Sequence, residues 1–312
     1  MTLKNCLIVD DLHKVIVPKL LDIGIESSYQ PQIKREEILK IIQDYDILLV
    51  RSKTVVDKEM LDAAPNLKVI GRAGAGVDQI DEAEVKKRNI MLLNAPEGNR
   101  VAVGEHTVGM LLALFNNFVR AHKQVSGLQW MREYNRGYEV AGKTIGIIGY
   151  GNMGKAFAKC LSGFDSRVIA YDVLGNNYGD QYAKEVTLDT IYKEADVLSL
   201  HIPLTNENNQ WIGEQFFNQF QKPIWFLNTA RGKIVNLKGL IAALKSGKVL
   251  GAALDVLENE KMNTFTDEEK EIHHTLSHMD QVLFTPHVGG WTHESYRKIS
   301  EVLADKLAKL VD

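Results

Sequence analysis

The chain has 312 residues, of which 45% are hydrophobic and 25% charged, a composition typical of folded proteins with material for about two domains. Lys and Arg total 37 against 40 Asp and Glu, so the net charge of −3 provides no basic excess for a nucleic-acid backbone. Two cysteines, Cys6 and Cys160, are too few for a disulfide framework, and the longest uncharged segment near residue 110, residues 107–119, is too short to cross a bilayer. We expect a cytoplasmic protein that binds neither nucleic acid nor membranes.

The first hundred residues alternate short apolar runs with amphipathic helical patterns. The runs lie at 6–9, 47–50, 68–70 and 90–93, and helical patterns such as 35–43 and 82–87 separate them. This alternation predicts βαβ units around a parallel sheet that is buried on both faces. Residues 100–127 follow as one expected helix, apolar almost all round over 108–115, which indicates a packed core or a dimer interface.

A second series of strands begins at Thr144. Six apolar runs are spaced as in a complete doubly wound domain, at 144–148, 167–171, 197–202, 224–227, 250–254 and 282–284. The final helical segment, 294–310, lies beyond this series, so it can return to the first domain. We therefore predict an α/β fold with two doubly wound parallel-sheet domains, one formed by residues 1–98 plus 291–312 and the other by residues 99–290.

A glycine-rich turn, Gly149-Tyr-Gly151-Asn-Met-Gly154, directly follows the strand at 144–148 and begins a helical segment. In this context the first glycine permits a tight turn, the second lets the backbone approach a pyrophosphate, and the third lets the helix pack on the strand. Asp172 follows the next strand, 18 residues after Gly154, where a carboxylate can accept hydrogen bonds from the ribose hydroxyls of NAD and would repel a 2′-phosphate. The sequence predicts a Rossmann domain that binds NAD.

Three segments at the ends of later strands, 228–232, 254–260 and 285–290, contribute Arg231, Glu260 and His287. Hydride transfer at a hydroxyl-bearing carbon needs a base for the hydroxyl proton and a cation for negative charge, and His287 and Arg231 suit these roles. Glu260 would orient the imidazole and raise its pKa. Each residue alone could be structural, and their joint occurrence after a dinucleotide motif favours catalysis.

These segments, together with Gly71–Asp78 and His201–Thr205, resemble the D-isomer-specific 2-hydroxyacid dehydrogenases over nearly the whole chain. Within the family the chain resembles most the phosphoglycerate dehydrogenases, in a short form without a C-terminal regulatory domain. The resemblance implies catalytic roles for Arg231, Glu260 and His287. One departure is Lys261, because the family usually has proline after the glutamate.

The resemblance also implies which residues contact NAD and how the domains divide the work. The implied cofactor contacts are Gly149, Gly151, Asn152, Met153, Gly154, Asp172, Ile202, Pro203, Thr229, Ala230, Asp255, Gly289 and Gly290. The NAD-binding domain of residues 99–290 would be inserted into a flavodoxin-like substrate-binding domain formed by 1–98 plus 291–312. We further expect a homodimer and no bound metal.

Basic residues end two neighbouring strands of the first domain. Arg51-Ser52-Lys53 ends one strand and Arg72 ends the next, so these cations could converge on the cleft between domains and bind the carboxylate and phosphate of a substrate. The resemblance adds Ser52, Ala75 and Gly76 to the expected substrate contacts. Exposed strand-end cations are the alternative interpretation, as plausible as substrate binding for Lys53.

We therefore expect NAD-dependent oxidation of 3-phosphoglycerate, or reduction of its 2-keto acid, in serine biosynthesis. The first alternative is a hydroxypyruvate or glyoxylate reductase. A protein of a different class, a dinucleotide-sensing corepressor that binds protein partners, is the second alternative, and the intact set of Arg231, Glu260 and His287 argues against it.

Several further residues allow two interpretations. His273, His274 and His278 lie in an acidic stretch, 264–279, and could share a metal, although a solvated helix is favoured. His201 could be structural or chemical. Trp291 could form a wall of the substrate pocket or cap the apolar core.

Overall fold

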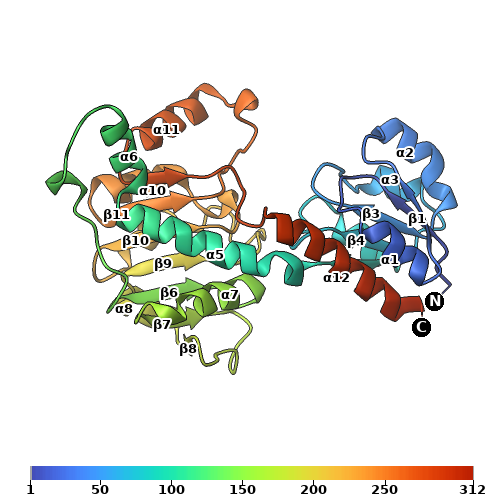
Figure 1. The fold of residues 1–312 in the computed structure, drawn as a ribbon, viewed down its shortest axis with the longest axis horizontal. Helices are drawn as coiled ribbons and strands as arrows, with labels where there is room; N and C mark the ends of the chain where they lie inside the picture. The colour runs from blue at the N-terminus through green and yellow to red at the C-terminus, as the bar shows by residue number, and fades with distance from the viewer. Residues whose placement is uncertain (1, 312) are drawn as a thin grey trace. The chain divides into compact units, whose positions relative to one another are not determined.

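A computed structural model describes residues 2–311 and divides the chain into two compact units (Figure 1). One unit comprises Met1–Val101 and Trp291–Asp312, and the other comprises Ala102–Gly290. Each unit is built around its own parallel sheet, which confirms the predicted fold class. No helix among the described residues is both long enough and apolar enough to span a membrane.

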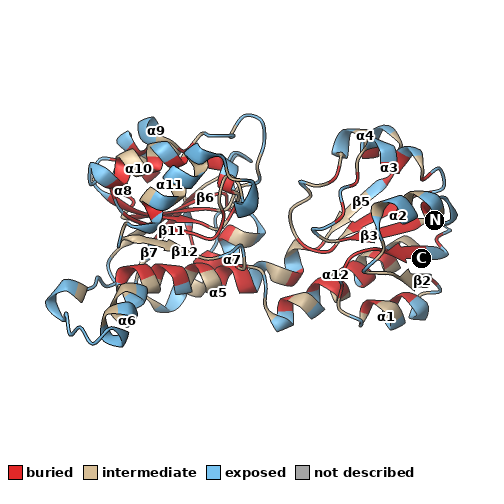
Figure 2. Ribbon diagram, turned by 90° about the horizontal axis from the view of Figure 1, so that it is seen from above, coloured by how far each residue is buried: buried red, intermediate tan, exposed pale blue. Residues whose placement is uncertain are grey.

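The first unit has five parallel strands in the order β2-β1-β3-β4-β5, the order of the flavodoxin-like fold. Successive residues of a strand point to opposite faces, so Ile47 and Leu49 pack with one core, and Leu48 and Val50 pack with the other. Helices α1 and α12, which lie side by side in Figures 1 and 2, cover the first of these cores. The strands are β1 (Asn5–Ile8), β2 (Glu26–Tyr29), β3 (Ile47–Val50), β4 (Val69–Arg72) and β5 (Met91–Asn94). The helices are α1 (Ile16–Asp22), α2 (Arg35–Ile41), α3 (Lys58–Asp62), α4 (Glu82–Lys87) and α12 (His293–Val311).

The second unit has seven parallel strands in the order β12-β11-β10-β9-β6-β7-β8. Counted from β6, this order contains the 3-2-1-4-5-6 arrangement of a Rossmann domain with one strand added. Figure 2 shows its central strands buried. The strands are β6 (Thr144–Ile148), β7 (Arg167–Tyr171), β8 (Lys184–Glu185), β9 (Val197–Leu200), β10 (Ile224–Asn228), β11 (Val249–Leu254) and β12 (Val282–Phe284). The helices are α5 (Pro96–Phe115), which begins in the first unit, α6 (Phe118–Ser126), α7 (Asn152–Cys160), α8 (Leu188–Glu194), α9 (Glu214–Asn218), α10 (Leu237–Lys245) and α11 (Asp267–Ser277).

Two edge strands were not predicted from the sequence. The strand β2 has the sequence Glu-Ser-Ser-Tyr, and β8 is only two residues long. Both lie at the edge of a sheet, where one neighbour supplies the backbone hydrogen bonds and no apolar run is needed.

The single helix expected over residues 100–127 is wrong, because α5 ends at Phe115 and α6 begins at Phe118. Asn117 adopts a left-handed backbone conformation with φ of 55°, which asparagine tolerates better than most residues. The Asn116 side chain donates to the Leu112 carbonyl over 3.1 Å and so satisfies an acceptor in the last turn. No glycine or proline marks this break in the sequence.

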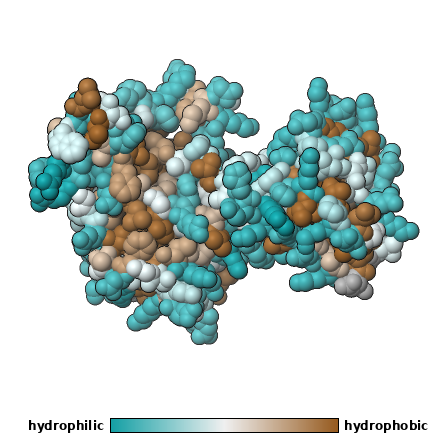
Figure 3. All heavy atoms as spheres, in the orientation of Figure 1, coloured by the Kyte–Doolittle hydropathy of each residue, from teal (hydrophilic) through white to brown (hydrophobic). Residues whose placement is uncertain are grey.

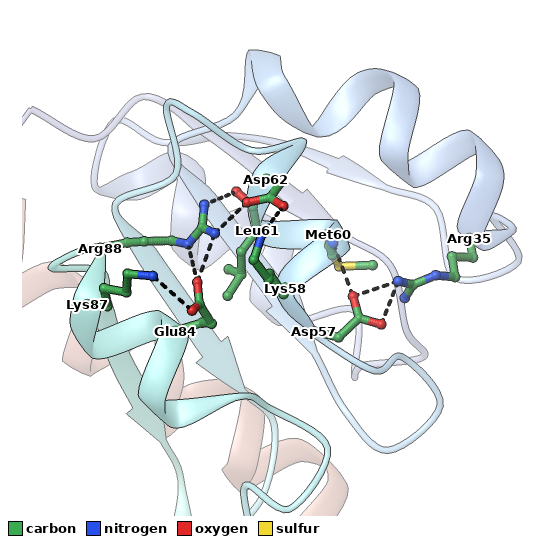
Figure 4. A network of polar contacts seen from close by, with 9 residues as sticks. All are labelled: Arg35, Asp57, Lys58, Met60, Leu61, Asp62, Glu84, Lys87 and Arg88. Carbon is green, nitrogen blue, oxygen red and sulfur yellow. Dashed lines mark hydrogen bonds and ion pairs between the residues drawn. The ribbon is translucent and has the colours of Figure 1, made fainter.

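Surface ion pairs join helices of the first unit (Figure 4). Arg88 contacts Asp62 at 2.5 Å and Glu84 at 2.9 Å, which links α3 to α4. Arg35 of α2 contacts Asp57, the N-cap residue of α3, at 2.6 Å. Because these groups remain solvent-accessible, the pairs contribute little to stability and act mainly on local orientation.

Candidate active site

The register of the second sheet brings the residues that follow five strands to one edge. Leu200 pairs with Ile148 on one side and with Asn228 on the other, and Leu254 pairs with Asn228 and Phe284. The residues directly after these strand positions therefore lie at the carboxyl edge of the sheet, where open α/β sheets bind ligands. They are Gly149, His201, Thr229, Asp255 and Thr285.

The glycine-rich turn has the local geometry that its sequence predicts. Gly149 has φ of 93°, and a Cβ there would come within 2.5 Å of the His201 carbonyl oxygen. A Cβ on Gly154 would lie 2.1 Å from the Gly149 oxygen, because α7 packs against the turn. A Cβ on Gly151 would meet open space, and the first residue of α7, Asn152, is exposed. The backbone amides at the start of α7 are thus accessible to a pyrophosphate group.

A cavity of about 610 Å³ opens beside this turn. Gly149, Gly151, Asp172, Ile202 and Pro203 line it, and all five are among the predicted cofactor contacts. The carboxylate of Asp172 accepts hydrogen bonds from the backbone N–H groups of Tyr150 (2.7 Å) and Leu174 (3.0 Å). These bonds hold the carboxylate at the cavity wall, so the residues present fit an adenosine ribose.

Other parts of this cavity wall were missed by sequence reasoning. Val173 and Leu174 are 83% and 84% exposed, although both are apolar, and they follow Asp172 directly. Apolar side chains left in water beside a carboxylate suit the face of an adenine ring. Thr205 and Trp211 also line the cavity. The feature that identifies Val173 and Leu174 is the exposure of their side chains to solvent, which cannot be read from the sequence.

His201 lines the same cavity, and its contacts are those of a structural residue. Its Nε2 lies 2.8 Å from Ser199 Oγ, and its ring lies 5.4 Å from that of Phe157. Desolvation lowers the pKa of His201 to about 3, so the imidazole is neutral at physiological pH. A neutral, hydrogen-bonded ring does not supply the proton of a reduction.

Glu260 and His287 form an ion pair in the second unit. Nδ1 of His287 lies 2.9 Å from a carboxylate oxygen of Glu260. This hydrogen bond raises the pKa of His287, although burial and the positive charge of Arg231 oppose the effect. Arg231 follows β10 and His287 follows β12, so both residues lie at the carboxyl edge of the same sheet. The bond also occupies Nδ1 and leaves Nε2 as the nitrogen available for chemistry.

Asp255 organises the loop that carries His287. Its buried carboxylate accepts hydrogen bonds from Thr285 Oγ1 (2.6 Å) and from the backbone N–H groups of Val288 (2.9 Å) and Gly289 (2.8 Å). Desolvation raises the pKa of Asp255, but hydrogen bonds from His106 and the loop outweigh it and lower the pKa overall. Both carboxylate oxygens thus serve the loop, whose next member, Gly290, is another predicted cofactor contact.

His287 itself has a left-handed backbone conformation, with φ of 55°. Its N–H donates to the Asp255 carbonyl over 2.8 Å, which stabilises this conformation. A residue other than glycine in this region carries a backbone strain of about 1–3 kcal/mol. The hydrogen bond to the Asp255 carbonyl compensates for this strain. The resulting backbone conformation places the imidazole of His287 beside Glu260.

A buried asparagine holds the loop of Arg231. Asn228 donates from Nδ2 to the Arg231 carbonyl (3.1 Å) and accepts at Oδ1 from the Ala230 N–H (3.0 Å). Thr229 Oγ1 lies 3.2 Å from Thr107 Oγ1 on α5. Sequence reasoning identified Thr229, Ala230 and Arg231 but missed the supporting residues. These are Thr107, Asn228, His106 and Thr285, which are ordinary polar residues in the sequence.

The five predicted substrate contacts belong to the first unit. Arg72 ends β4 and pairs with Val50 of β3, so Arg51 and Arg72 lie at the same edge of neighbouring strands. Ala75 and Gly76 are partly buried in the loop after β4, and Ser52 is exposed. Lys53 donates to the carbonyls of Val9 (3.2 Å) and Pro31 (2.7 Å), a structural role.

The structure also locates the histidines of the acidic stretch and Trp291, for which the sequence allowed two interpretations. His273 stacks on Phe284, with ring centroids 5.7 Å apart, and the rings of His274 and His278 lie 4.0 Å apart. Across residues 2–311 no cluster of three or more His, Cys, Asp or Glu side chains is arranged to hold a metal ion. Trp291 is 62% exposed, so it does not cap the apolar core.

The comparisons with known proteins agree with this geometry. Residues 108–289 match the family model described as "D-isomer specific 2-hydroxyacid dehydrogenase, NAD binding domain". The chain belongs to this family. It is an NAD-dependent D-2-hydroxyacid dehydrogenase that acts on a small hydroxy or keto acid. The predicted family, fold class and cofactor are therefore confirmed.

Individual dehydrogenases of this family show how widely its substrates vary. The chain is 37% identical to the hydroxypyruvate reductase of Thermotoga maritima, over 96% of both chains. It is 33% identical to the D-3-phosphoglycerate dehydrogenase of Archaeoglobus fulgidus, over 97% of this chain and 56% of that relative. A solved D-lactate dehydrogenase of Aquifex aeolicus, in complex with NAD and lactic acid, has a TM-score of 0.82 and 26% identity over 99% of this chain and 95% of that one.

Proposed function

We propose that this dehydrogenase oxidises 3-phosphoglycerate, or reduces the corresponding 2-keto acid, with Arg231, Glu260 and His287 as its catalytic residues. The observation that carries the choice of substrate is the pair of arginines at neighbouring strand ends of the first unit, Arg51 and Arg72. Because Arg231 is assigned to the substrate carboxylate, further guanidinium groups at these strand ends suit a substrate that also carries a phosphate.

In the oxidation, Nε2 of His287 takes the proton of the substrate hydroxyl. Glu260 holds Nδ1 of His287 at 2.9 Å, so it orients the ring and stabilises the imidazolium that forms. In the reduction, the same imidazolium donates its proton to the keto oxygen. Arg231 binds the substrate carboxylate and compensates its charge. NAD⁺, when bound, would accept the hydride in the oxidation, and NADH would supply it in the reduction.

The turn at Gly149–Gly154 would hold the pyrophosphate of NAD through the amides of Gly151, Asn152 and Met153. Asp172 would hold the adenosine ribose. The remaining predicted contacts border the same edge of the sheet and would complete the site. They are Ile202, Pro203, Thr229, Ala230, Asp255, Gly289 and Gly290.

A second candidate is reduction of hydroxypyruvate or glyoxylate. The 37% identity to a hydroxypyruvate reductase over 96% of both chains favours it. The chemistry of Arg231, Glu260 and His287 would be the same, and only the use of Arg51 and Arg72 would differ. A dinucleotide-sensing corepressor has no need of the Glu260–His287 ion pair, so we do not favour that class.

We further propose that two copies of the chain form a homodimer through α6 and the loop that follows it. Apolar side chains are exposed along this segment, among them Phe118, Val125, Leu128 and Trp130. Figure 2 shows the segment exposed, and Figure 3 shows apolar surface over neighbouring α5. Large apolar side chains exposed in one segment are typical of an interface between subunits.

Turnover of a panel of acids tests the proposed function through the absorbance of the reduced nicotinamide. The panel contains 3-phosphoglycerate, D-glycerate and D-lactate, with phosphohydroxypyruvate, hydroxypyruvate and glyoxylate for the reverse direction. We expect the highest kcat/KM with the phosphorylated pair. Higher kcat/KM with hydroxypyruvate would favour the second candidate, and no turnover of either phosphorylated acid would contradict the proposed substrate.

The role of His287 is tested in the same assay with His287→Asn. We expect kcat to fall about 10²–10⁴-fold, since general acid–base catalysis contributes that factor. Binding of NADH, measured by its fluorescence, should persist. If the variant retains more than half of the wild-type kcat, His287 is not the acid–base residue.

A further inference from the structure

Arg51 of the first unit lies over two aromatic rings. Its guanidinium carbon is 3.9 Å from the centroid of the Trp291 ring and 5.1 Å from that of Tyr296. Trp291 precedes α12 and Tyr296 lies in its first turn, whereas Arg51 follows β3. Residues 240 positions apart in the sequence thus build one cation–aromatic stack.

The backbone of Arg51 is fixed independently of its side chain. Its N–H donates to the buried carboxylate of Asp10 over 2.6 Å, and its carbonyl accepts a hydrogen bond from the Gln79 side chain. Asp10 also accepts from the Thr54 hydroxyl over 2.6 Å, which anchors the loop after β3. The direction of the side chain therefore depends on what its guanidinium group contacts.

The segment that carries the two rings also has fixed partners. Thr292 and Ser295 exchange hydrogen bonds between side chain and backbone (2.9 and 3.0 Å) at the start of α12, which fixes the turn that bears both rings. The His13 ring packs edge-on against Tyr296, with centroids 5.4 Å apart. Trp291 nevertheless leaves 62% of its surface exposed, so the stack faces solvent.

The nearby acid does not neutralise the guanidinium through a hydrogen bond. Arg51 donates to the backbone carbonyl of Asp11 over 3.3 Å, while the Asp11 carboxylate accepts from the Tyr29 hydroxyl over 3.0 Å. Desolvation and the neighbouring Asp11 raise the pKa of Tyr296 to about 12, so its phenol adds no second negative charge. Within residues 2–311 that carbonyl is the one acceptor found for the guanidinium of Arg51.

We propose that Trp291 and Tyr296 are positioning residues that hold the Arg51 guanidinium as a platform for the phosphate of the substrate. Stacking uses the face of the guanidinium and leaves its N–H groups in the plane, where they can bind a phosphate in bidentate fashion. Selectivity for a phosphorylated acid then depends on an aromatic ring at residue 291. This inference rests on the proposed function.

The test compares Trp291→Leu with Trp291→Phe, which keeps an aromatic face. We measure the ratio of kcat/KM for 3-phosphoglycerate to kcat/KM for D-glycerate. Trp291→Leu should lower this ratio roughly 3- to 30-fold, through KM rather than kcat, since a cation–π contact contributes about 0.5–2 kcal/mol. Trp291→Phe should restore most of it. In an Arg51→Gln background, Trp291→Leu should change the ratio no further.

An equal loss with both acids, or an additive loss in the Arg51→Gln background, would overturn the proposal. If the wild-type enzyme does not turn over 3-phosphoglycerate, the proposed substrate is wrong, and the site is then tested with inorganic phosphate alone. Binding of phosphate measured by isothermal titration calorimetry in the wild type, lost in Arg51→Gln and weakened in Trp291→Leu, would support an anion platform for another acid. Absent binding, or equal binding in all three proteins, would contradict it.

Discussion

At the scale of single residues, the candidate chemistry depends on how each charged side chain is held. Nδ1 of His287 is hydrogen-bonded to the Glu260 carboxylate, and the backbone N–H of His287 donates to the Asp255 carbonyl. Asp172 has both carboxylate oxygens on backbone N–H groups. Substitutions at these positions should therefore change the pKa of His287 and the cofactor selectivity that depends on Asp172.

The pH dependence of reduction should report the Glu260–His287 ion pair. Reduction needs the imidazolium, so kcat/KM should be constant at low pH and fall as pH rises through the pKa of His287. Because Glu260 raises that pKa, Glu260→Gln should move the descending limb to lower pH. Oxidation needs the neutral imidazole, so its ascending limb should move in the same direction.

Glu268→Gln is a suitable control for this profile, because Glu268 pairs with Lys238 on the surface. Glu268→Gln should leave the pH of the descending limb unchanged. An unchanged limb in Glu260→Gln would mean that Glu260 does not set the pKa of the catalytic group.

The choice between NAD and NADP should depend on Asp172. A carboxylate held at the cavity wall binds ribose hydroxyls and repels a 2′-phosphate, so we expect the wild type to prefer NAD. Asp172→Ala should reduce the NAD/NADP ratio of kcat/KM by roughly 10- to 150-fold, the range expected for losing one hydrogen bond to a charged group. Equal use of both cofactors by the wild type would refute the assignment.

At the scale of elements, the break between α5 and α6 depends on one backbone conformation. Asn117 has φ of 55° and lies between the end of α5 at Phe115 and the start of α6 at Phe118. Asn117→Val should destabilise the protein by about 1–2 kcal/mol, because a β-branched residue is strained there, whereas Asn117→Gly should be nearly neutral. Thermal unfolding should show a fall of roughly 2–8 °C for valine alone. Equal melting temperatures would mean that the break tolerates any residue.

At the scale of the whole molecule, the exposed apolar segment predicts the oligomeric state. Leu128 and Trp130 are 96% and 82% exposed, so a dimer that buries them should dissociate when both become polar. Sedimentation of a Leu128→Ser/Trp130→Ser variant should give a folded monomer and the wild type a dimer. Leu174→Ser, which removes an equally exposed apolar side chain at the cofactor cavity, should remain dimeric. A monomeric wild type would contradict the proposed homodimer.

Most of the fold and much of the candidate site could be predicted from the sequence, because their signals are local. Buried parallel strands are continuous apolar runs, and a glycine-rich turn needs its glycines for steric reasons that follow from its own backbone. Arg231, Glu260 and His287 each follow a recognisable strand, and parallel strands bring such positions to one edge. The family, the NAD cofactor and the order of the elements were therefore accessible.

Only the tertiary structure decided which polar residues support those positions. Thr107, His106 and Thr285 act through partners far away in the chain, so nothing local distinguishes them from surface residues. Asn228 bonds to the backbone of the loop that follows it, and its role depends on a burial that the sequence does not show. The same holds for Trp291, whose ring lies on Arg51 instead of in the core, and for Lys53, which binds two carbonyl groups. Edge strands and the left-handed Asn117 were missed because neither needs a distinctive residue pattern. Burial, exposure and long-range contact are properties of the folded chain, and they determine which of its charges are available to a substrate.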